Sequence, residues 1–360
     1  MVTKKHIITL SKKLIAIESV ASNVPAQQAC LDLLEAEFGN DFFVKRYVFK
    51  GHPAIVFSTS KRKKVDVIFS GHTDVVPGGR ALFKPKIVGS KLYGRGSYDM
   101  KSGVVACLCA TREYRAGGGT KDIAVLITSD EETSGYGTKM LLDKHKYHAE
   151  FAFIPDGGND TGIVLKQKGF MQLKVRLQGK SAHSAYPWDG DNAIVKAFKL
   201  KNLVEKYFPA PTKREQWKTS VVLSRVETDN SLNQVPGSAT VYFDIRYVDD
   251  SHPKKIIALL NKYDGSKTSV EVISKNNIFY SDEKNVYVQE FAEVVQEYGK
   301  KKVSFVRENG ASDAVFFTEH NIPATLYRPK GGELHHDGEW IDVDSLYTMY
   351  LILVKFLQRL

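Results

Sequence analysis

Hydrophobic positions in the first 165 residues follow two different spacings. Ile7, Leu10, Leu14 and Ile17 recur at helical spacing, as do apolar residues within 31–38. Short β-branched and aromatic runs predict strands at 54–57, 65–69, 123–127 and 151–154, and helices at 102–115 and 137–146 separate the last three. Because these strands are apolar throughout and alternate with helices, we expect a buried, mixed and largely parallel sheet flanked by helices.

A different pattern begins near residue 169. Residues 171–177 are apolar at every second position, which is typical of a strand with one solvent-facing side. Helices at 192–207 and 253–263 and strands at 220–226, 240–246 and 269–273 complete a small α+β unit. After residue 279 the α/β pattern returns and ends in a helix at 343–357. The predicted organisation is an α/β domain (1–168 and 281–360) split by an inserted α+β domain (169–280).

Composition fits an ordinary globular protein of two domains. The chain has 360 residues, of which 42% are hydrophobic and 26% charged. No apolar run approaches the length of a membrane span, so we expect no membrane partner. Three cysteines cannot form a disulfide framework, and the amino-terminal residues do not resemble a secretion signal. A cytoplasmic location is therefore expected.

The net charge of +10 raises the question of a nucleic-acid partner. The lysines are scattered, however, and the longest basic run, 61–64, is expected in a loop between two strands. We therefore expect no nucleic-acid binding. Attraction of a small anionic substrate is a milder interpretation of the same charge.

Polar residues that can bind metals follow several of the predicted strands. His72 and Asp74 follow the strand at 65–69, where a histidine can ligate a metal and an aspartate can orient its ring. A polar turn is the alternative. Asp99 precedes a predicted helix, so its carboxylate is either a helix cap or a ligand.

Further acidic residues and histidines occupy later segments. The run 130–132 places three acids at a strand end, either as an exposed turn or as a cation site. Asp156 stands where another strand stops, and residues 333–340 read Glu-Leu-His-His-Asp-Gly-Glu-Trp. Carboxylates and imidazoles without cysteine suit zinc, cobalt or manganese. More than four such ligands suggest two metal ions about 3.5–4 Å apart.

These segments together resemble a known family. Gly-His-Thr-Asp-Val-Val-Pro (71–77), Gly-Arg-Gly-x-x-Asp-Met-Lys (94–101), the Glu-Glu pair, an acid before glycines and a late His-x-x-x-Glu occur in the family's order along nearly the whole chain. The family is that of the co-catalytic metallohydrolases, which includes succinyl-diaminopimelate desuccinylases, acetylornithine deacetylases, aminoacylases, carboxypeptidase G and di- and tripeptidases. The resemblance implies a phosphorylase/hydrolase-like catalytic domain with a ferredoxin-like dimerisation and lid domain.

The resemblance also implies a role for each residue. Two divalent ions, Zn²⁺ first and Co²⁺ or Mn²⁺ as alternatives, would be bound by His72, Asp99, Glu132, Asp156 and His335, with Asp99 as the bridge. Asp74 would hold the ring of His72, and Glu131 would be the general base. His336 is the alternative to His335.

The inserted domain also contains a motif that resembles the family. His183, within Gly-Lys-Ser-Ala-His-Ser-Ala-Tyr-Pro, is implied to reach the active site of a partner subunit, which predicts a homodimer through this domain. Asn233 and Arg246 match positions that contact the substrate carboxylate, and Gly310 and Ser312 match the loop beside it. An ordinary salt bridge is the alternative role for Arg246.

The expected reaction is hydrolysis of the amide bond of an N-acyl amino acid or small peptide by a metal-activated water. A dipeptidase or aminopeptidase of the same family is the main alternative, and a non-catalytic binding module is a third. Residues 80–85 depart from the family's Asp-Pro-Phe segment, and Ser102 replaces a glycine. Asp156 stands where desuccinylases usually have glutamate, which favours a peptide substrate.

Overall fold

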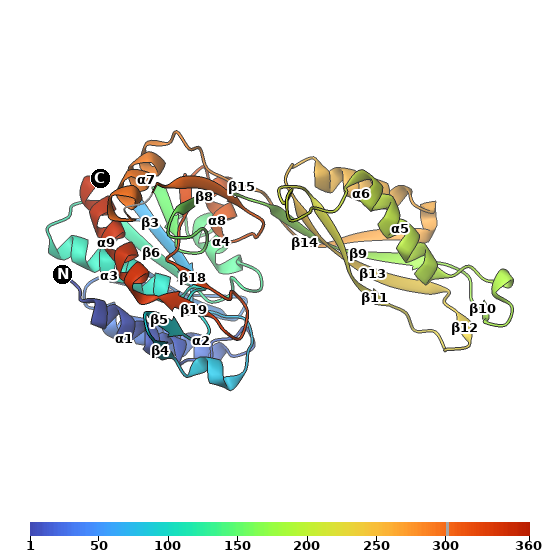
Figure 1. Ribbon diagram of the computed structural model, residues 1–360, viewed down its shortest axis with the longest axis horizontal. Helices are drawn as coiled ribbons and strands as arrows, with labels where there is room; N and C mark the ends of the chain where they lie inside the picture. The colour runs from blue at the N-terminus through green and yellow to red at the C-terminus, as the bar shows by residue number, and fades with distance from the viewer. Residues whose placement is uncertain (300–301) are drawn as a thin grey trace. The chain divides into compact units, whose positions relative to one another are not determined.

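The chain folds into two compact units. The structure is a computed structural model that describes residues 1–299 and 302–360. The first unit comprises Met1–Lys166, Tyr280–Glu308 and Ser312–Leu360, and the second comprises Gln167–Phe279 and Asn309–Ala311. The first unit is therefore discontinuous in sequence, because the chain leaves it, forms the second unit and returns (Figure 1).

A large mixed sheet forms the centre of the first unit, with the order β1-β2-β6-β3-β7-β17-β8-β15 and β16 paired with β8. Its strands are β1 Phe43–Phe49, β2 His52–Ser58, β3 Lys64–His72, β6 Ile123–Thr128, β7 His148–Ile154, β8 Gly162–Gln167, β15 Phe279–Tyr280, β16 Ser304–Glu308 and β17 Ala324–Leu326. The central strands β6, β3, β7 and β17 run parallel, and β1, β2 and β8 pair antiparallel. Every residue of β6 is buried, as the continuous apolar runs predicted. The α/β fold class is confirmed.

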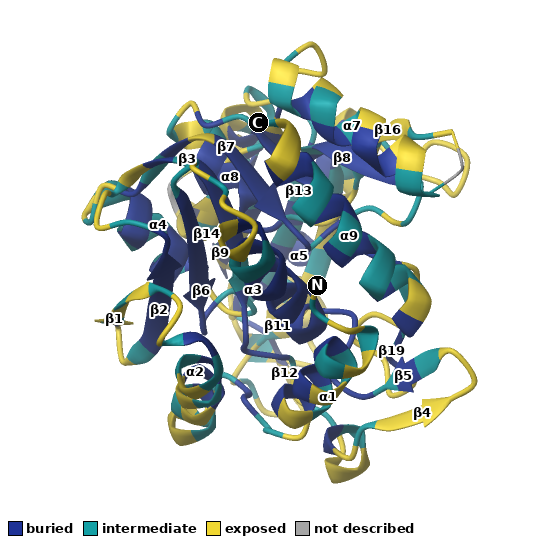
Figure 2. Ribbon diagram, turned by 90° about the vertical axis from the view of Figure 1, so that its left-hand side faces the viewer, coloured by how far each residue is buried: buried dark blue, intermediate teal, exposed yellow. Residues whose placement is uncertain are grey.

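Helices cover this sheet. They are α1 Lys4–Ile15, α2 Val24–Phe38, α3 Lys101–Ala116, α4 Tyr136–Asp143, α7 Val286–Gly299, α8 Ala314–Glu319 and α9 Val343–Arg359, with a short 3₁₀ turn at Arg80–Phe83. α3 packs against α1 and α9 and is buried along most of its length (Figure 2). The apolar spacing predicted the buried face of α1, which comprises Ile7, Leu10 and Leu14.

A second, small sheet joins two distant parts of the first unit. Its order is β18-β19-β5-β4, formed by β4 Lys86–Val88, β5 Lys91–Tyr93, β18 Gly331–Gly332 and β19 Trp340–Asp342. β19 pairs antiparallel with β5, so that Trp340 lies opposite Tyr93. The segment that follows β5 is thereby placed beside the segment that precedes β19.

The second unit is an antiparallel sheet with two helices on one face. The sheet order is β11-β13-β9-β14. Its elements are β9 Gly169–Gln178, α5 Ala193–Tyr207, β11 Ser220–Glu227, β13 Ser238–Tyr247, α6 His252–Lys262 and β14 Thr268–Asn276. Buried positions alternate along β9 and β13, and their buried side chains share one core with those of α5 and α6. A ribbon of β10 (Ala182–His183) and β12 (Gln234–Val235), with 3₁₀ turns at Pro187–Asp189 and Gly265–Lys267, completes the unit.

Two details refine the sequence predictions. α4 ends at Asp143, before the predicted limit of 146, and Lys146 adopts a left-handed φ of 61° that no helix continues through. The basic run 61–64 joins β2 to β3, as predicted. Across the described residues, we find no helix that combines the length and the apolar character needed to cross a membrane.

Candidate metal centre

Several predicted site residues lie where neighbouring strands of the large sheet end. His72 is the last residue of β3, Glu131 and Glu132 follow β6, and Asp156 follows β7. Because β3 runs parallel to β6 and β7, the carboxyl ends of all three meet at one edge of the sheet. Asp99 reaches the same place from the start of α3. The N-cap position of that helix is Met100, so the carboxylate of Asp99 is not used as a helix cap.

The candidate ligands form two groups that share Asp99. In the first, the His72 group, a ligand atom from each of His72, Asp99 and Asp156 lies within 4.8 Å of the others. The second, the His335 group, joins Asp99, Glu132 and His335 within the same distance. One oxygen of Asp99 lies 3.3 Å from Nε2 of His72, and its other oxygen lies 3.1 Å from Nε2 of His335. Asp99 thus stands between the two groups, with one oxygen toward each.

The ligand atoms fit divalent cations. Nε2 of His72 and Oδ1 of Asp99 are buried and have no hydrogen-bond partner among the described residues. A buried polar atom without a partner is costly, and a metal ion provides the missing interaction. Imidazole nitrogens and carboxylate oxygens without thiolates match zinc, cobalt or manganese.

Asp74 contacts Nδ1 of His72, while Nε2 of the same ring faces Asp99. Nδ1 of His72 lies 3.0 Å from the backbone carbonyl of Asp74 and 3.4 Å from its carboxylate. The carboxylate also accepts a 2.9 Å hydrogen bond from the backbone N–H of Glu132. Burial alone would lower the pKa of His72, but its contacts with Asp74 and Asp99 outweigh burial and raise that pKa well above its ordinary value. Asp74 therefore orients one candidate ligand and anchors the backbone of another.

The centre concentrates more negative charge than buried carboxylates normally tolerate. Burial raises the pKa of the Glu131 carboxyl well above its ordinary value, and the charges of Asp156 and Asp313 add to this rise. Burial and the charge of Asp99 raise the pKa of Asp156 in the same way. Burial also raises the pKa of Asp313 to about 7. Divalent cations would offset this repulsion, which favours a metal centre over an exposed acidic turn.

Glu131 belongs to neither ligand group. One of its carboxylate oxygens lies 3.9 Å from Nε2 of His72, and its side chain is 15% exposed. The residue therefore sits beside the ligands without being needed as one. A carboxylate beside a metal centre is a candidate general base.

The geometry distinguishes His335 from its neighbour. Nε2 of His335 lies 3.1 Å from Asp99 and 3.5 Å from Glu132. These contacts raise the pKa of His335 to about 10. His336 belongs to neither ligand group of the described chain. Of the two alternatives, His335 is the one whose ring faces the centre.

Arg328 and Lys101 are buried cations that were not predicted to be site residues. The Arg328 guanidinium lies 3.9 Å from Asp156 and 4.4 Å from the ring centroid of Tyr98. Lys101 is buried after Asp99 and Met100 and donates to the backbone carbonyls of Leu14 and Ile17 at 3.0 and 2.7 Å. Lys101 stood within a quoted segment without an assigned role. Nothing in the local sequence around Arg328 indicates that it is buried.

The predicted substrate residues are distributed over both units. His183 and Asn233 belong to the β10–β12 ribbon, where the backbone N–H of Ser184 donates to the carbonyl of Asn233. Arg246, near the end of β13, donates to Asp244 at 2.9 Å, which is the salt bridge foreseen as its alternative role. Gly310 groups with the second unit and Ser312 with the first. The structure thus brings the candidate metal ligands together, whereas His183 lies in the β10–β12 ribbon and Arg246 lies near the end of β13 in the four-stranded sheet.

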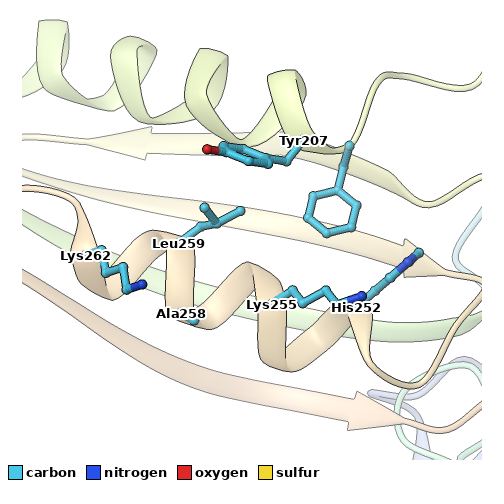
Figure 3. Close-up of a pocket in the computed structure, with 7 residues that line it drawn as sticks. Tyr207, His252, Lys255, Ala258, Leu259 and Lys262 are labelled. Carbon is cyan, nitrogen blue, oxygen red and sulfur yellow. The ribbon is translucent and has the colours of Figure 1, made fainter.

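A pocket in the second unit has a different character. It encloses about 410 Å³ between the end of α5 and α6 and is lined by Tyr207, Phe208, His252, Lys255, Ala258, Leu259 and Lys262 (Figure 3). Its lining includes no carboxylate and no group of metal ligands. The candidate metal ligands therefore lie at the strand ends of the first unit and not in this pocket.

Comparison with known proteins places this site in context. The sequence profile of peptidase family M20/M25/M40 matches residues 68–359. A curated succinyl-diaminopimelate desuccinylase from Wolbachia pipientis is 26% identical, with 98% of this chain and 92% of the relative covered. Another, from Buchnera aphidicola, is 28% identical with 99% of each chain covered.

Solved structures share the fold. Aminopeptidase PepT from Bacillus cereus gives a TM-score of 0.80 at 21% identity, covering 99% of this chain and 98% of the other. A tripeptidase from Staphylococcus aureus gives 0.81 at 19% identity, covering 100% of both chains. The profile match covers most of the sequence and confirms the resemblance inferred from the motifs. This chain belongs to peptidase family M20/M25/M40 and is a metal-dependent hydrolase of amide bonds.

Proposed function

We propose that this enzyme removes the acyl group from an N-acyl amino acid, with a succinylated diamino acid as the first candidate substrate, and that it uses two divalent metal ions. The observation that carries the proposal is the position of Asp99, whose two oxygens face His72 and His335 at 3.3 and 3.1 Å. Shared carboxylate ligation is typical of two-metal hydrolases. Similarity to desuccinylases along nearly the full length supports the substrate class.

The metal ions and the side chains of the centre have separate proposed roles in the reaction. Zinc is the proposed metal, with cobalt and manganese as alternatives, and the bound ions would supply Lewis acidity and lower the pKa of a water molecule. Glu131 would accept a proton from the attacking water and pass it to the leaving amine. Asp74 would keep the ring of His72 in its tautomer through the contacts at Nδ1.

We propose that His183 acts in the site of a second copy of the chain. The β10–β12 ribbon lies at one end of the second unit, next to the start of β13 at Ser238 (Figure 1). Arg246 lies near the other end of this 10-residue strand, which spans about 30 Å. A small substrate cannot reach both residues of one unit. If both contact the substrate, as the family resemblance implies, two subunits must supply them, and the enzyme is a homodimer.

The substrate class is tested by amine release from a mixed panel. The panel contains succinyl-diaminopimelate, acetylornithine, other N-acyl amino acids and dipeptides, each with zinc or cobalt and again with a chelator. We expect chelator-sensitive release from the succinylated compound. Release from dipeptides alone would replace the desuccinylase proposal by a dipeptidase, which the aspartate at position 156 favours. Silence across the panel with metal bound would point to an acyl group outside the panel or to a binding role.

Complementation between subunits tests the role of His183. Glu131→Gln and His183→Ala are each expected to be nearly inactive as homodimers. Coexpression produces mixed dimers in which one site combines an intact Glu131 with an intact His183 from the partner. Random pairing then restores about a quarter of the wild-type activity in a twofold-symmetric dimer. Activity that stays at the level of the single variants would show that His183 does not act across subunits.

A further inference from the structure

A buried ion pair lies directly beneath the metal ligands. Arg95 and Glu339 are 2% and 1% exposed, and Nη1 of Arg95 donates to Oε2 of Glu339 at 2.8 Å. Arg95 comes two residues after β5, and Glu339 immediately precedes β19. The pairing of β5 with β19 therefore brings the two side chains together from positions 244 residues apart. Neither residue belongs to a ligand group.

Glu339 holds the backbone of the shared ligand. Its Oε1 accepts hydrogen bonds from the backbone N–H of Tyr98 at 2.9 Å and from that of Asp99 at 3.1 Å. Both bonds fix the peptide groups from which the Asp99 carboxylate projects. Hydrogen bonds to an ionised acceptor are stronger than neutral ones, so this anchor is firm.

Arg95 binds the backbone of the loop that contains His335 and His336. Its Nη2 donates to the carbonyl of His335 and its Nη1 to that of His336, both at 3.3 Å. His335 has a φ of +61°, and Glu333 has a φ of +58°. Residues with side chains adopt this left-handed conformation rarely, and it persists only where surrounding contacts enforce it. The arginine fork provides such contacts at the residue whose ring faces Asp99.

We propose that Arg95 and Glu339 are positioning residues that preorganise Asp99 and His335 and thereby set the affinity of the His335 group for its metal ion. The inference rests on the proposed two-metal function. A buried ion pair is by itself weak support for stability. Here the hydrogen bonds that the pair makes beyond its own contact are directed at the two loops that carry ligands. Partners behind a ligand commonly control metal affinity in this way.

Two variants separate the effect of Arg95 on the His335 loop from the effect of Glu339 on Asp99. In Arg95→Lys the charge remains, but the ammonium lacks the planar fork that reaches Glu339 and both carbonyls together. This variant loosens only the His335 loop. The dissociation constant for zinc at the His335 group should therefore rise about 10–100-fold, while the dissociation constant for zinc at the His72 group stays nearly constant. In Glu339→Gln the anchor on Asp99 also weakens, so both groups should lose affinity, the His335 group more.

Glu113→Gln is the matched control. Glu113 accepts a 2.9 Å hydrogen bond from the backbone N–H of Val2 and pairs with the amino terminus at 3.0 Å. It lies in the last turn of α3, about 20 Å along the helix from Asp99. The variant removes a comparable charge and should leave both metal affinities unchanged.

The measurement is a zinc titration of metal-stripped protein against a chromophoric chelator, with circular dichroism to establish folding. Arg95→Lys keeps the buried charge and provides a folded test even if Glu339→Gln does not fold. Selective weakening of one of two ions in Arg95→Lys supports the inference. Unchanged affinities, or equal weakening at both ions, overturn it. Wild-type protein that binds fewer than two ions would overturn the two-metal proposal itself, which is a distinct result.

Discussion

Replacement of Glu131 by glutamine is expected to lower kcat by about 10²–10⁴-fold while both metal ions remain bound. The amide has the same size as the carboxylate but cannot accept the proton of the attacking water. Glu131 lies in neither ligand group, so the ligands stay in place. The experiment measures kcat on the substrate identified by the panel, together with metal content by mass spectrometry.

The preceding acid offers a close control. Asp130 accepts hydrogen bonds from the backbone N–H of Gly137 and the hydroxyl of Ser134, which makes it a support for the turn. Asp130→Asn should therefore reduce stability and retain most of kcat. Turnover of Glu131→Gln close to the wild-type value would sink the assignment of the base.

Replacement of Asp99 by alanine should have the second large effect, because it removes a ligand from both groups at once. We expect neither ion to remain bound after gel filtration. Wild-type protein should gain about 2.7 kcal/mol of stability from each bound ion when zinc is present at 100 times the dissociation constant of that ion, and Asp99→Ala should lose this gain. Urea unfolding with and without zinc measures the difference.

Glu132→Ala serves as the comparison for Asp99→Ala. Glu132 belongs to the His335 group alone, so this variant should lose one ion and keep the other. Retention of two ions by Asp99→Ala would contradict the bridging position of that carboxylate. Equal metal loss in both variants would show that the two groups do not act as separate sites.

Long periodic segments made most of the fold predictable. β6 could be predicted because it is an uninterrupted apolar run, and α3 because its apolar residues extend over a helix-length segment. The strands β5, β18 and β19 were not recognised, because strands of two or three residues show no period. The pairing of β5 with β19 joins Tyr93 to Trp340, two segments far apart in the sequence, which no local pattern specifies.

Some residues of the candidate site could likewise be predicted from the sequence, and others could not. His72 and Asp156 were accessible from the sequence because ligands at the ends of parallel strands share one edge. Only the structure shows that Asp99 does not cap α3, since an acid before a helix can be a cap or a ligand. Arg328 was missed because its burial against Tyr98 and Asp156 is a tertiary property.

The large separation in sequence between Asp99 and His335 determines when the candidate site is completed during synthesis of the chain. The two residues in contact are 236 positions apart. At about 5–20 residues per second, a ribosome needs roughly 12–47 s to synthesise the intervening chain. By the end of that interval the nascent protein carries His72, Asp99, Glu132 and Asp156 but still lacks His335. If the enzyme binds two ions as proposed, the His335 group can bind its ion only after the whole inserted unit has been synthesised.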